Sequence, residues 1–166
     1  MGAGKTTVGR KLAAALELPF RDADSEIEKA AGLTIPEIFE LHGEADFRGG
    51  ERRVIKRLVC CEPVHVLATG GGAFMDGETR ALLKERAITV WLRADIDVLT
   101  KRVGRRETRP LLKNGDPRVV MERLMAERYP VYAEADLVID SGHGPHANAT
   151  AAVIAALKTH LQQTVQ

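Results

Sequence analysis

A glycine-rich segment at the start of the chain carries the residue types of a phosphate-binding loop. GAGKTT at positions 2–7 matches the second half of the Walker A pattern, GxxxxGK followed by serine or threonine, at Gly4, Lys5 and Thr6. In such a loop the backbone amides and a helix N-terminus surround a β-phosphate, the lysine supplies a positive charge, and the Thr6 hydroxyl binds magnesium. The alternative is an ordinary helix start with flexible glycines and an exposed lysine. The segment predicts binding of a nucleoside triphosphate.

The pattern of this loop begins before the first residue of the chain. Its leading glycine would lie two residues before Met1, and the strand that normally leads into the loop would precede that glycine. That strand is usually central in the sheet, so its loss would leave unpaired edges on two neighbouring strands. We therefore expect Met1 to be an internal residue of the loop, with a short β-strand before it in the complete protein.

Two carboxylates follow the next predicted strand. In DAD at positions 22–24, Asp22 can face a magnesium ion, while Asp24 can face a substrate hydroxyl and orient or deprotonate it. The alternative is that both acids cap the helix that follows. Taken alone, the segment favours the capping interpretation, and only together with the other motifs does it point to a phosphoryl acceptor with a hydroxyl group.

Arginines and glycines further along the chain suit an anionic acceptor. FRGGE at positions 47–51 places Arg48 and Glu51 three apart on one helix face, so an ion pair is the first interpretation. If Arg48 instead points into a cleft, its guanidinium can grip a carboxylate with Glu51 holding it in place. TGGG at positions 69–72 follows a strand, where bare backbone can approach a ligand closely or form a flexible turn.

A second arginine, Arg128, precedes Pro130 near a predicted helix break, where it is either a solvated surface residue or a second anion ligand. Met121 and Met125, four residues apart on the same predicted helix, indicate core packing rather than a binding surface. The basic stretch at 104–118 is rich in glycine and proline and predicts a lid over the nucleotide.

Helix and strand patterns alternate along the chain, which predicts an α/β fold with a parallel sheet covered by helices. Capping boxes are predicted at Ser25 with Glu28 and at Thr34 with Glu37. A bend or close packing is expected at Gly49 and Gly50. The expected helices are 5–18, two short ones after the capping boxes, 44–62, 78–86, one capped by Asp95, one through Met121 and Tyr129, and 147–161. The expected strands are a short one through Arg21, 64–68, 88–92 and 137–139.

The bulk composition excludes several classes of protein. The 166 residues suit one domain, and 24 basic against 23 acidic residues give no field that would favour nucleic acid. No apolar run reaches the length of a membrane helix. Cys60 and Cys61 are adjacent and cannot staple distant segments, which favours a reducing cytoplasm. His143 and His146 have no ligand cluster beside them and indicate a polar loop rather than a metal site.

The motifs together resemble the shikimate kinases, through GAGKTTVGRKLA, DAD, FRxxE, TGGGA, RPLL and RxPxY in this order. The resemblance covers almost the whole chain. It implies a three-layer P-loop kinase fold in one domain over 1–166, with a substrate-binding helical region at about 24–62. It also implies ATP-dependent phosphorylation of shikimate to shikimate 3-phosphate with Mg²⁺, by a monomer that binds neither nucleic acid nor membrane.

The resemblance assigns the site residues to two sets. The acceptor set would bind shikimate, with Asp24 as catalytic base and Arg48 and Arg128 on the carboxylate; its other members are Gly70, Gly71, Gly72, Phe39, Phe47 and Glu51. The nucleotide set would bind ATP, with Lys5 and Arg109 as catalytic charges on the phosphates; its other members are Gly2, Ala3, Gly4, Thr6, Thr7, Pro110 and, over the adenine, Arg102.

Two alternatives stay open at this point. Another small P-loop kinase, of the gluconate or nucleoside monophosphate type, would share the phosphate loop. A non-catalytic remnant that binds nucleotide or a partner protein would account for the incomplete loop. The chain also departs from the family pattern, because SGHGPH at 141–146 lacks the basic residue that some relatives place near the adenine.

Overall fold

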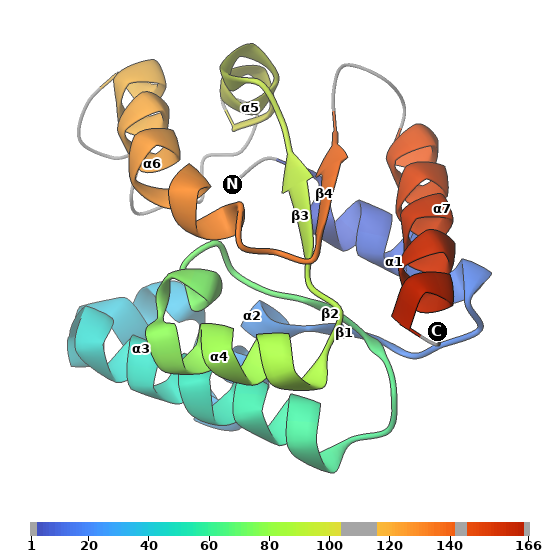
Figure 1. Cartoon of the computed structure of the whole chain (residues 1–166). Helices are drawn as coiled ribbons and strands as arrows, with labels where there is room; N and C mark the ends of the chain where they lie inside the picture. The colour runs from blue at the N-terminus through green and yellow to red at the C-terminus, as the bar shows by residue number, and fades with distance from the viewer. Residues whose placement is uncertain (1–2, 104–115, 142–145, 165–166) are drawn as a thin grey trace. The chain divides into compact units, whose positions relative to one another are not determined.

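The computed structural model describes residues 3–103, 116–141 and 146–164, and its elements are labelled in Figure 1. The chain divides into two compact units. We call Ala13–Ala87 the continuous unit, and Met1–Leu12 with Ile88–Gln166 the discontinuous unit. Both have an α/β architecture with parallel strands flanked by helices, as the alternating pattern predicted. Each unit is described by itself below.

The continuous unit contains two parallel strands and the helices that cover them. Strand β1 (Phe20–Asp22) pairs with β2 (Val66–Ala68), with Phe20 opposite Val66 and Asp22 opposite Ala68. Because the strands are parallel, both end at the same edge of the sheet. The segments that leave this edge are the start of α2 (Ala23–Ala31) and the glycine turn before η1 (Ala73–Met75). Helices α3 (Ile35–Cys61) and α4 (Gly77–Arg86) complete the unit.

The two helix starts in this unit follow different capping patterns. At α3 the predicted capping box is confirmed, since Glu37 N–H donates to Thr34 Oγ1 at 3.5 Å and Thr34 N–H donates to Glu37 Oε2 at 2.7 Å. At α2 the predicted box at Ser25 is wrong. The chain enters α2 directly from β1, so Asp22 is the cap, and Ser25 already lies inside the helix. The carboxylate of Asp22 accepts the N–H of Asp24 at 3.2 Å.

Helix α3 is bent at Gly43, not at Gly49 and Gly50 as expected. Gly43 has φ 80° and ψ 177°, a conformation that favours glycine and interrupts the helix just before the predicted start at 44. Gly49 and Gly50 stay helical, and a Cβ at Gly50 would meet nothing within 4 Å. The close packing expected there is therefore also wrong at Gly50. The straight half after the bend carries the arginine and glutamate of the acceptor set.

Two apolar clusters hold the continuous unit together. The first joins α2 to both halves of α3, and the second joins the start of α2 and the middle of α3 to η1 and α4. Leu67 on β2 packs against both, so the sheet and the helices share one core. Their buried members are Ile27, Ile38, Phe47, Val54 and Leu58 in the first cluster, and Ala23, Ile55, Ala73 and Leu83 in the second.

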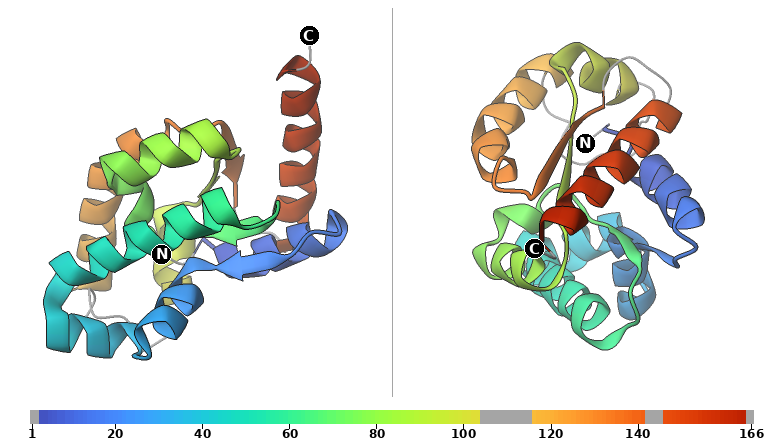
Figure 2. Two further views of the ribbon diagram at one scale, coloured as in Figure 1. Left: turned by 90° about the horizontal axis from the view of Figure 1, so that it is seen from below. Right: turned by 45° about the vertical axis from the view of Figure 1, so that its right-hand side comes forward.

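The discontinuous unit contains the second pair of parallel strands. Strand β3 (Val90–Arg93) pairs with β4 (Leu137–Asp140), and α6 (Pro117–Tyr132) and α7 (His146–Thr164) lie on opposite sides of the pair (Figures 1 and 2). Helix α5 (Ile96–Val103) packs against α6, and α1 (Lys5–Ala15) begins in this unit. Its core cluster consists of Ala3, Ala94, Val98, Leu99 and Met121, with Met125 packed against it. The core role predicted for Met121 and Met125 is confirmed.

Two predictions about the surroundings of α6 need correction. No break occurs at Pro130, because this proline lies in the last turn of α6 and the helix continues to Tyr132. The C-terminal end of the predicted lid is not a loop, since Asp116 caps α6 and Pro117 begins it. The rest of the lid, 104–115, lies outside the described residues. Among the described helices, none combines the length and the apolar character that a membrane crossing needs.

Candidate active site

The site lies at the shared edge of β1 and β2, where carboxylate side chains lie close to the backbone of glycine residues. Asp24 lies exposed in the first turn of α2. A Cβ added to Gly70 would lie 3.2 Å from Asp24 Oδ1 and 3.1 Å from Glu51 Oε1. The backbone after β2 therefore passes between two carboxylates that come from α2 and α3. Of the acceptor set, the structure brings these three residues together.

Glu51 is the buried member of this group. It is 2% exposed, its Oε2 accepts a hydrogen bond from Arg48 Nη1 at 2.7 Å, and its Oε1 has no hydrogen-bond partner among the described residues. Burial raises the pKa of Glu51, and the negative charges of Asp24 and Asp76 add to this, while Arg48 opposes it. A buried carboxylate with one unpaired oxygen is costly unless it has a purpose, and here it fixes an arginine.

Arg48 is held by acids at two positions of its own helix. Besides Glu51, its Nη2 donates to Glu44 Oε1 at 3.2 Å. Burial would lower the pKa of Arg48, but the hydrogen bonds and charges of Glu51 and Glu44 raise it. The ion pair predicted with Glu51 is confirmed. Each terminal nitrogen of a guanidinium carries two N–H groups, so these two bonds leave one N–H on each nitrogen for a planar anion.

Glycine and phenylalanine set the position of this guanidinium. A Cβ at Gly72 would lie 2.6 Å from Arg48 Cζ, so only a residue without a side chain lets Arg48 lie there. On the Phe47 side, Arg48 Cζ lies 5.1 Å from the ring centroid, within the range of a cation–π contact. Phe47 is 5% exposed and its ring lies 4.7 Å from that of Phe39, which is half-buried. Phe47 thus acts on the site mainly through Arg48.

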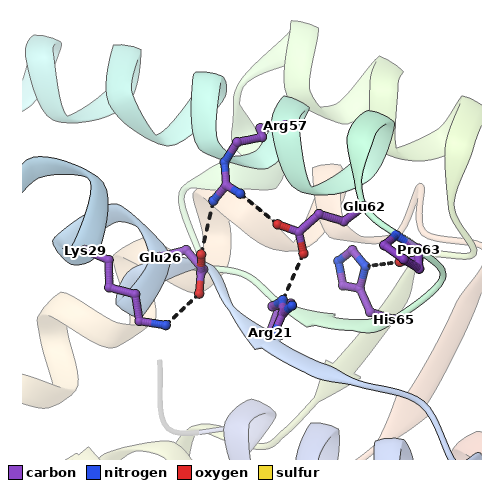
Figure 3. A network of polar contacts seen from close by, with 7 residues as sticks. All are labelled: Arg21, Glu26, Lys29, Arg57, Glu62, Pro63 and His65. Atoms are coloured by element: carbon purple, nitrogen blue, oxygen red, sulfur yellow. Dashed lines mark hydrogen bonds and ion pairs between the residues drawn. The ribbon is translucent and has the colours of Figure 1, made fainter.

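An ion-pair network on the surface joins β1, α2 and α3 (Figure 3). At its centre Arg57 of α3 donates to Glu26 of α2 at 3.1 Å and to Glu62 at 2.7 Å. Glu62 also accepts a bond from Arg21 of β1 at 2.9 Å, and Glu26 one from Lys29 at 2.9 Å. The cations are exposed, so each pair by itself contributes little to stability. Together they tie the junction of β1 and α2, which carries the DAD segment, to the helix of Arg48.

The phosphate loop lies in the discontinuous unit. Ala3 is buried, Gly4 has φ 85°, and α1 begins at Lys5, with Val8 N–H donating to Gly4 O at 2.9 Å. A positive φ favours glycine at this position, which agrees with the loop pattern. Lys5 is half-buried, whereas Thr6 and Thr7 are exposed in the first turn. A helix N-terminus that follows a glycine turn offers its amides to an anion.

The remaining residues of the two sets are placed as follows. Arg128 on α6 lines a cavity of about 30 Å³, which is close to the volume of one water molecule and too small for a ring acid. Gly71 is half-buried between the two glycines already described. Arg102 belongs to α5, but its side chain lies outside the described residues, as do Gly2, Arg109, Pro110 and His143 altogether. The meeting of Arg48 and Arg128 on one carboxylate stays a prediction.

The predicted magnesium ligands supply oxygen donors, which is the chemistry that Mg²⁺ prefers. Thr6 presents a hydroxyl at the start of α1, and Asp22 presents a carboxylate of which Oδ1 caps α2. No group of three or more His, Cys, Asp or Glu gathers in the described part of the chain. Mg²⁺ in kinases keeps several waters and takes phosphate oxygens, so one carboxylate and one hydroxyl fit it without such a group.

Two polar residues of the site were missed from the sequence. Glu44 holds the second nitrogen of Arg48, and its position four residues earlier on the helix was a usable signal. Asp76 caps α4 by accepting the N–H and hydroxyl of Thr79 at 2.9 Å each, and it pairs with Arg52 at 3.1 Å. The D-x-x-T spacing of 76–79 indicates a helix start. This cap is what directs the chain away from the glycine turn.

The chain is similar to known proteins in both sequence and structure. The family model described as shikimate kinase matches residues 1–158. The chain is 57% identical over 161 residues to a shikimate kinase of Bradyrhizobium diazoefficiens, covering 97% of the chain and 77% of the relative. It is 55% identical over 158 residues to one of Caulobacter vibrioides, covering 95% and 78%. A solved shikimate kinase of Acinetobacter baumannii in complex with shikimate is 39% identical, with a TM-score of 0.91 over 96% of the chain and 89% of that structure.

Proposed function

The chain belongs to the shikimate kinase family, and we propose that the acceptor and nucleotide sets carry the family's reaction in the roles given below. The chain is an ATP-dependent kinase that phosphorylates shikimate to shikimate 3-phosphate, a transferase of aromatic amino acid (chorismate) biosynthesis. The structural observation that carries the residue assignment is the guanidinium of Arg48, held by Glu51 against Gly72 beside Asp24. This arrangement presents a cation and a carboxylate to a ligand that has both an acid and hydroxyl groups.

In the acceptor set, Arg48 grips the shikimate carboxylate with the N–H groups that Glu51 and Glu44 leave over, and Arg128 is a second ligand of that carboxylate. The glycines 70–72 let the ring lie against the backbone. Asp24 accepts a hydrogen bond from the reacting hydroxyl and takes its proton as the new O–P bond forms. In the same displacement the bond between the γ-phosphorus and the β,γ-bridging oxygen of ATP breaks, and this oxygen leaves as part of ADP.

In the nucleotide set, the amides at 2–4 and at the start of α1, together with Thr7, surround the phosphates, and Lys5 neutralises the charge that develops on the transferred group. Arg109 and Pro110 act from the lid, and Arg102 lies over the adenine. Because the transition state is loose, positioning and charge supply most of the acceleration, and proton transfer to Asp24 supplies a smaller part that turnover still requires. A closed lid excludes water and limits hydrolysis of ATP.

Mg²⁺ is the implied cofactor, with Thr6 and Asp22 as its protein ligands. When bound, it would offset the negative charge of the phosphates. The Thr6 hydroxyl is exposed at the helix start where the phosphates would lie. Asp22 can act as a ligand while it caps α2, because a carboxylate offers lone pairs on both oxygens.

We further propose a monomer that works in the cytoplasm without nucleic acid or membrane. The balanced charge supports this, with 24 basic and 23 acidic residues. Cys60 and Cys61 are free and exposed, as suits a reducing compartment. Light scattering after size exclusion would test the monomer, and a mass near 36 kDa, about twice that of the 18.1 kDa chain, would contradict it.

A coupled assay of ADP release with three acceptors tests the function. The chain should turn over shikimate and leave gluconate and AMP unchanged, with ³¹P NMR showing one new phosphomonoester. Turnover of gluconate or AMP in place of shikimate would identify another small-molecule kinase. Binding of MgATP without turnover of any acceptor would identify a non-catalytic remnant.

A further inference from the structure

The hydroxyl of Ser141 holds a carbonyl group of the phosphate loop. Ser141 Oγ donates a buried hydrogen bond of 2.9 Å to Ala3 O, across 138 positions of sequence. Ser141 is 3% exposed, and its N–H donates to Arg93 O at 2.6 Å, which continues the ladder between β3 and β4 by one residue. The hydroxyl is therefore fixed by the end of the sheet, and the Ala3 carbonyl is fixed by the hydroxyl.

This bond determines where the next amide of the loop points. In a trans peptide the carbonyl and the following N–H point in opposite directions, and none of the described peptide bonds is cis. The bond from Ser141 to Ala3 O therefore directs the N–H of Gly4 away from Ser141. Backbone amides in a glycine turn ahead of a helix are the donors that bind phosphate.

The peptide between Ala3 and Gly4 is also the one most in need of a restraint. Ala3 is 8% exposed and belongs to the buried cluster that contains Ala94, Val98, Leu99 and Met121, so its position is restrained. Gly4, with φ 85°, has the wide rotational freedom of glycine, and a rotation of the peptide plane would turn its N–H out of the loop. Among the described residues, one hydroxyl group donates a hydrogen bond to that peptide, and it belongs to Ser141.

We propose that Ser141 is a positioning residue of the nucleotide site, whose hydroxyl keeps the Gly4 N–H directed at the polyphosphate of ATP. The inference rests on the proposed function, in which this loop binds ATP. Ser141 acts through the Ala3 carbonyl and does not touch the nucleotide. A purely structural role for the same bond would change the stability of the fold and leave nucleotide affinity untouched, so the two explanations predict different measurements.

The test compares Ser141→Ala, Ser141→Cys and Ser141→Thr with the wild type. The readouts are the Kd for ADP by calorimetry, KM for MgATP and for shikimate, and the melting temperature. Alanine removes the donor, and cysteine keeps the volume with a weak donor, so both should raise the ADP Kd and the MgATP KM by about 5- to 10-fold. The KM for shikimate should stay within about 2-fold, since this peptide is not part of the proposed acceptor set. Threonine keeps the hydroxyl and should restore ADP affinity.

A matched control is Thr159→Ala on α7. It also removes a hydroxyl that donates to a backbone carbonyl, here Ala155 O at 3.2 Å, but on the exposed face of a helix. This variant should keep the wild-type Kd for ADP and the wild-type KM for MgATP and for shikimate. Folded alanine and cysteine variants with wild-type ADP affinity would overturn the inference alone. A wild type that binds no ADP and shows no turnover would overturn the proposed function, and this inference with it.

Discussion

The guanidinium of Arg48 lies where a side chain at position 72 would be, so close that a Cβ at Gly72 would lie 2.6 Å from Arg48 Cζ. Phe47 supports the guanidinium at a centroid distance of 5.1 Å, and Glu51 binds it at 2.7 Å. Three different kinds of contact thus determine one position of a flexible side chain. That position, beside Asp24 and the glycine turn, decides which ligands the continuous unit can bind.

Replacing Gly72 with alanine should displace Arg48 without unfolding the protein, because the group in the way is the end of a flexible side chain. We expect KM for shikimate to rise by about 10-fold or more, which is the effect of losing one charge-assisted hydrogen bond, with KM for MgATP unchanged. Steady-state kinetics measure both. The control is Gly77→Ala at the start of α4, where a Cβ would meet nothing within 4 Å. Equal shikimate KM values in the two variants would contradict the role of Gly72.

Glu51→Gln should change how stability depends on pH. Burial raises the pKa of Glu51 in the folded state. The contribution of Glu51 to the free energy of unfolding is therefore fully present below the unfolded pKa, near 4.5, and is lost as the pH rises through the folded pKa. The stability of Glu51→Gln relative to wild type should therefore increase with pH above about 4.5. Urea unfolding from pH 4 to 8 measures this difference.

Glu62→Gln provides a control of opposite sign for this measurement. The hydrogen bond from Arg21 lowers the pKa of Glu62, so its stabilisation is present above the unfolded pKa and disappears as the pH falls through the folded one. Relative to wild type, this variant should be less stable at neutral pH, and the difference should shrink as the pH falls below about 4.5, so the urea series for this variant extends down to about pH 3. If both variants show the same trend with pH, the inference that burial raises the pKa of Glu51 is wrong.

Asp24→Asn should abolish turnover while leaving ATP binding intact, because an amide cannot accept the proton of the reacting hydroxyl. Calorimetry with the non-hydrolysable analogue AMP-PNP and the coupled assay measure the two properties on one sample. Asp46→Asn, an exposed acid on α3 with the same chemical change, should retain wild-type turnover. A normal rate in Asp24→Asn would exclude Asp24 as the base.

Asp136→Asn should weaken the start of the β3–β4 pair. Asp136 Oδ2 accepts the N–H and the hydroxyl of Thr89 at 2.7 and 2.6 Å, and Thr89 Oγ1 accepts the N–H of Asp136 at 2.9 Å. Although partial burial raises the pKa of Asp136, the Thr89 hydrogen bonds lower it overall, so its stabilisation is lost as the pH falls through the folded pKa. We expect a loss of about 1 kcal/mol at pH 7 and less in acid. Combined with Thr89→Val in a double-mutant cycle, additive effects would contradict the coupling.

Much of the fold could be predicted from local patterns. The strand predicted through Arg21, the strand predicted over 64–68 and the capping box at Thr34 are confirmed, and the structure bounds the two strands at Phe20–Asp22 and Val66–Ala68. The bend of α3 could not be located in this way. Gly43, Gly49 and Gly50 all reduce helix propensity by a similar amount, and packing over the whole helix determines which one leaves the helical region.

In the candidate site, too, some features could be predicted from the sequence and others could not. Arg48, Glu51 and Gly72 lie within motifs whose chemistry suggested a role before their contacts were known. The sequence could not show that Gly72 lies under Arg48, because 24 positions separate them and only the α3 packing brings them together. The bond from Ser141 to Ala3 leaves no sequence signal at all, since a serine after a strand is ordinary and its partner is a backbone carbonyl.

The central claim is that Arg48 recognises the carboxylate of shikimate, and one comparison tests it directly. Calorimetry should give the affinities of wild type and Arg48→Lys for shikimate and for its neutral carboxamide, with Arg53→Lys as the exposed control on the same helix. We predict that Arg48→Lys weakens shikimate binding by about 10-fold or more, since lysine cannot make the bidentate grip, and changes carboxamide binding by less than about 2-fold. An equal loss for both ligands, or none for shikimate, would contradict the account.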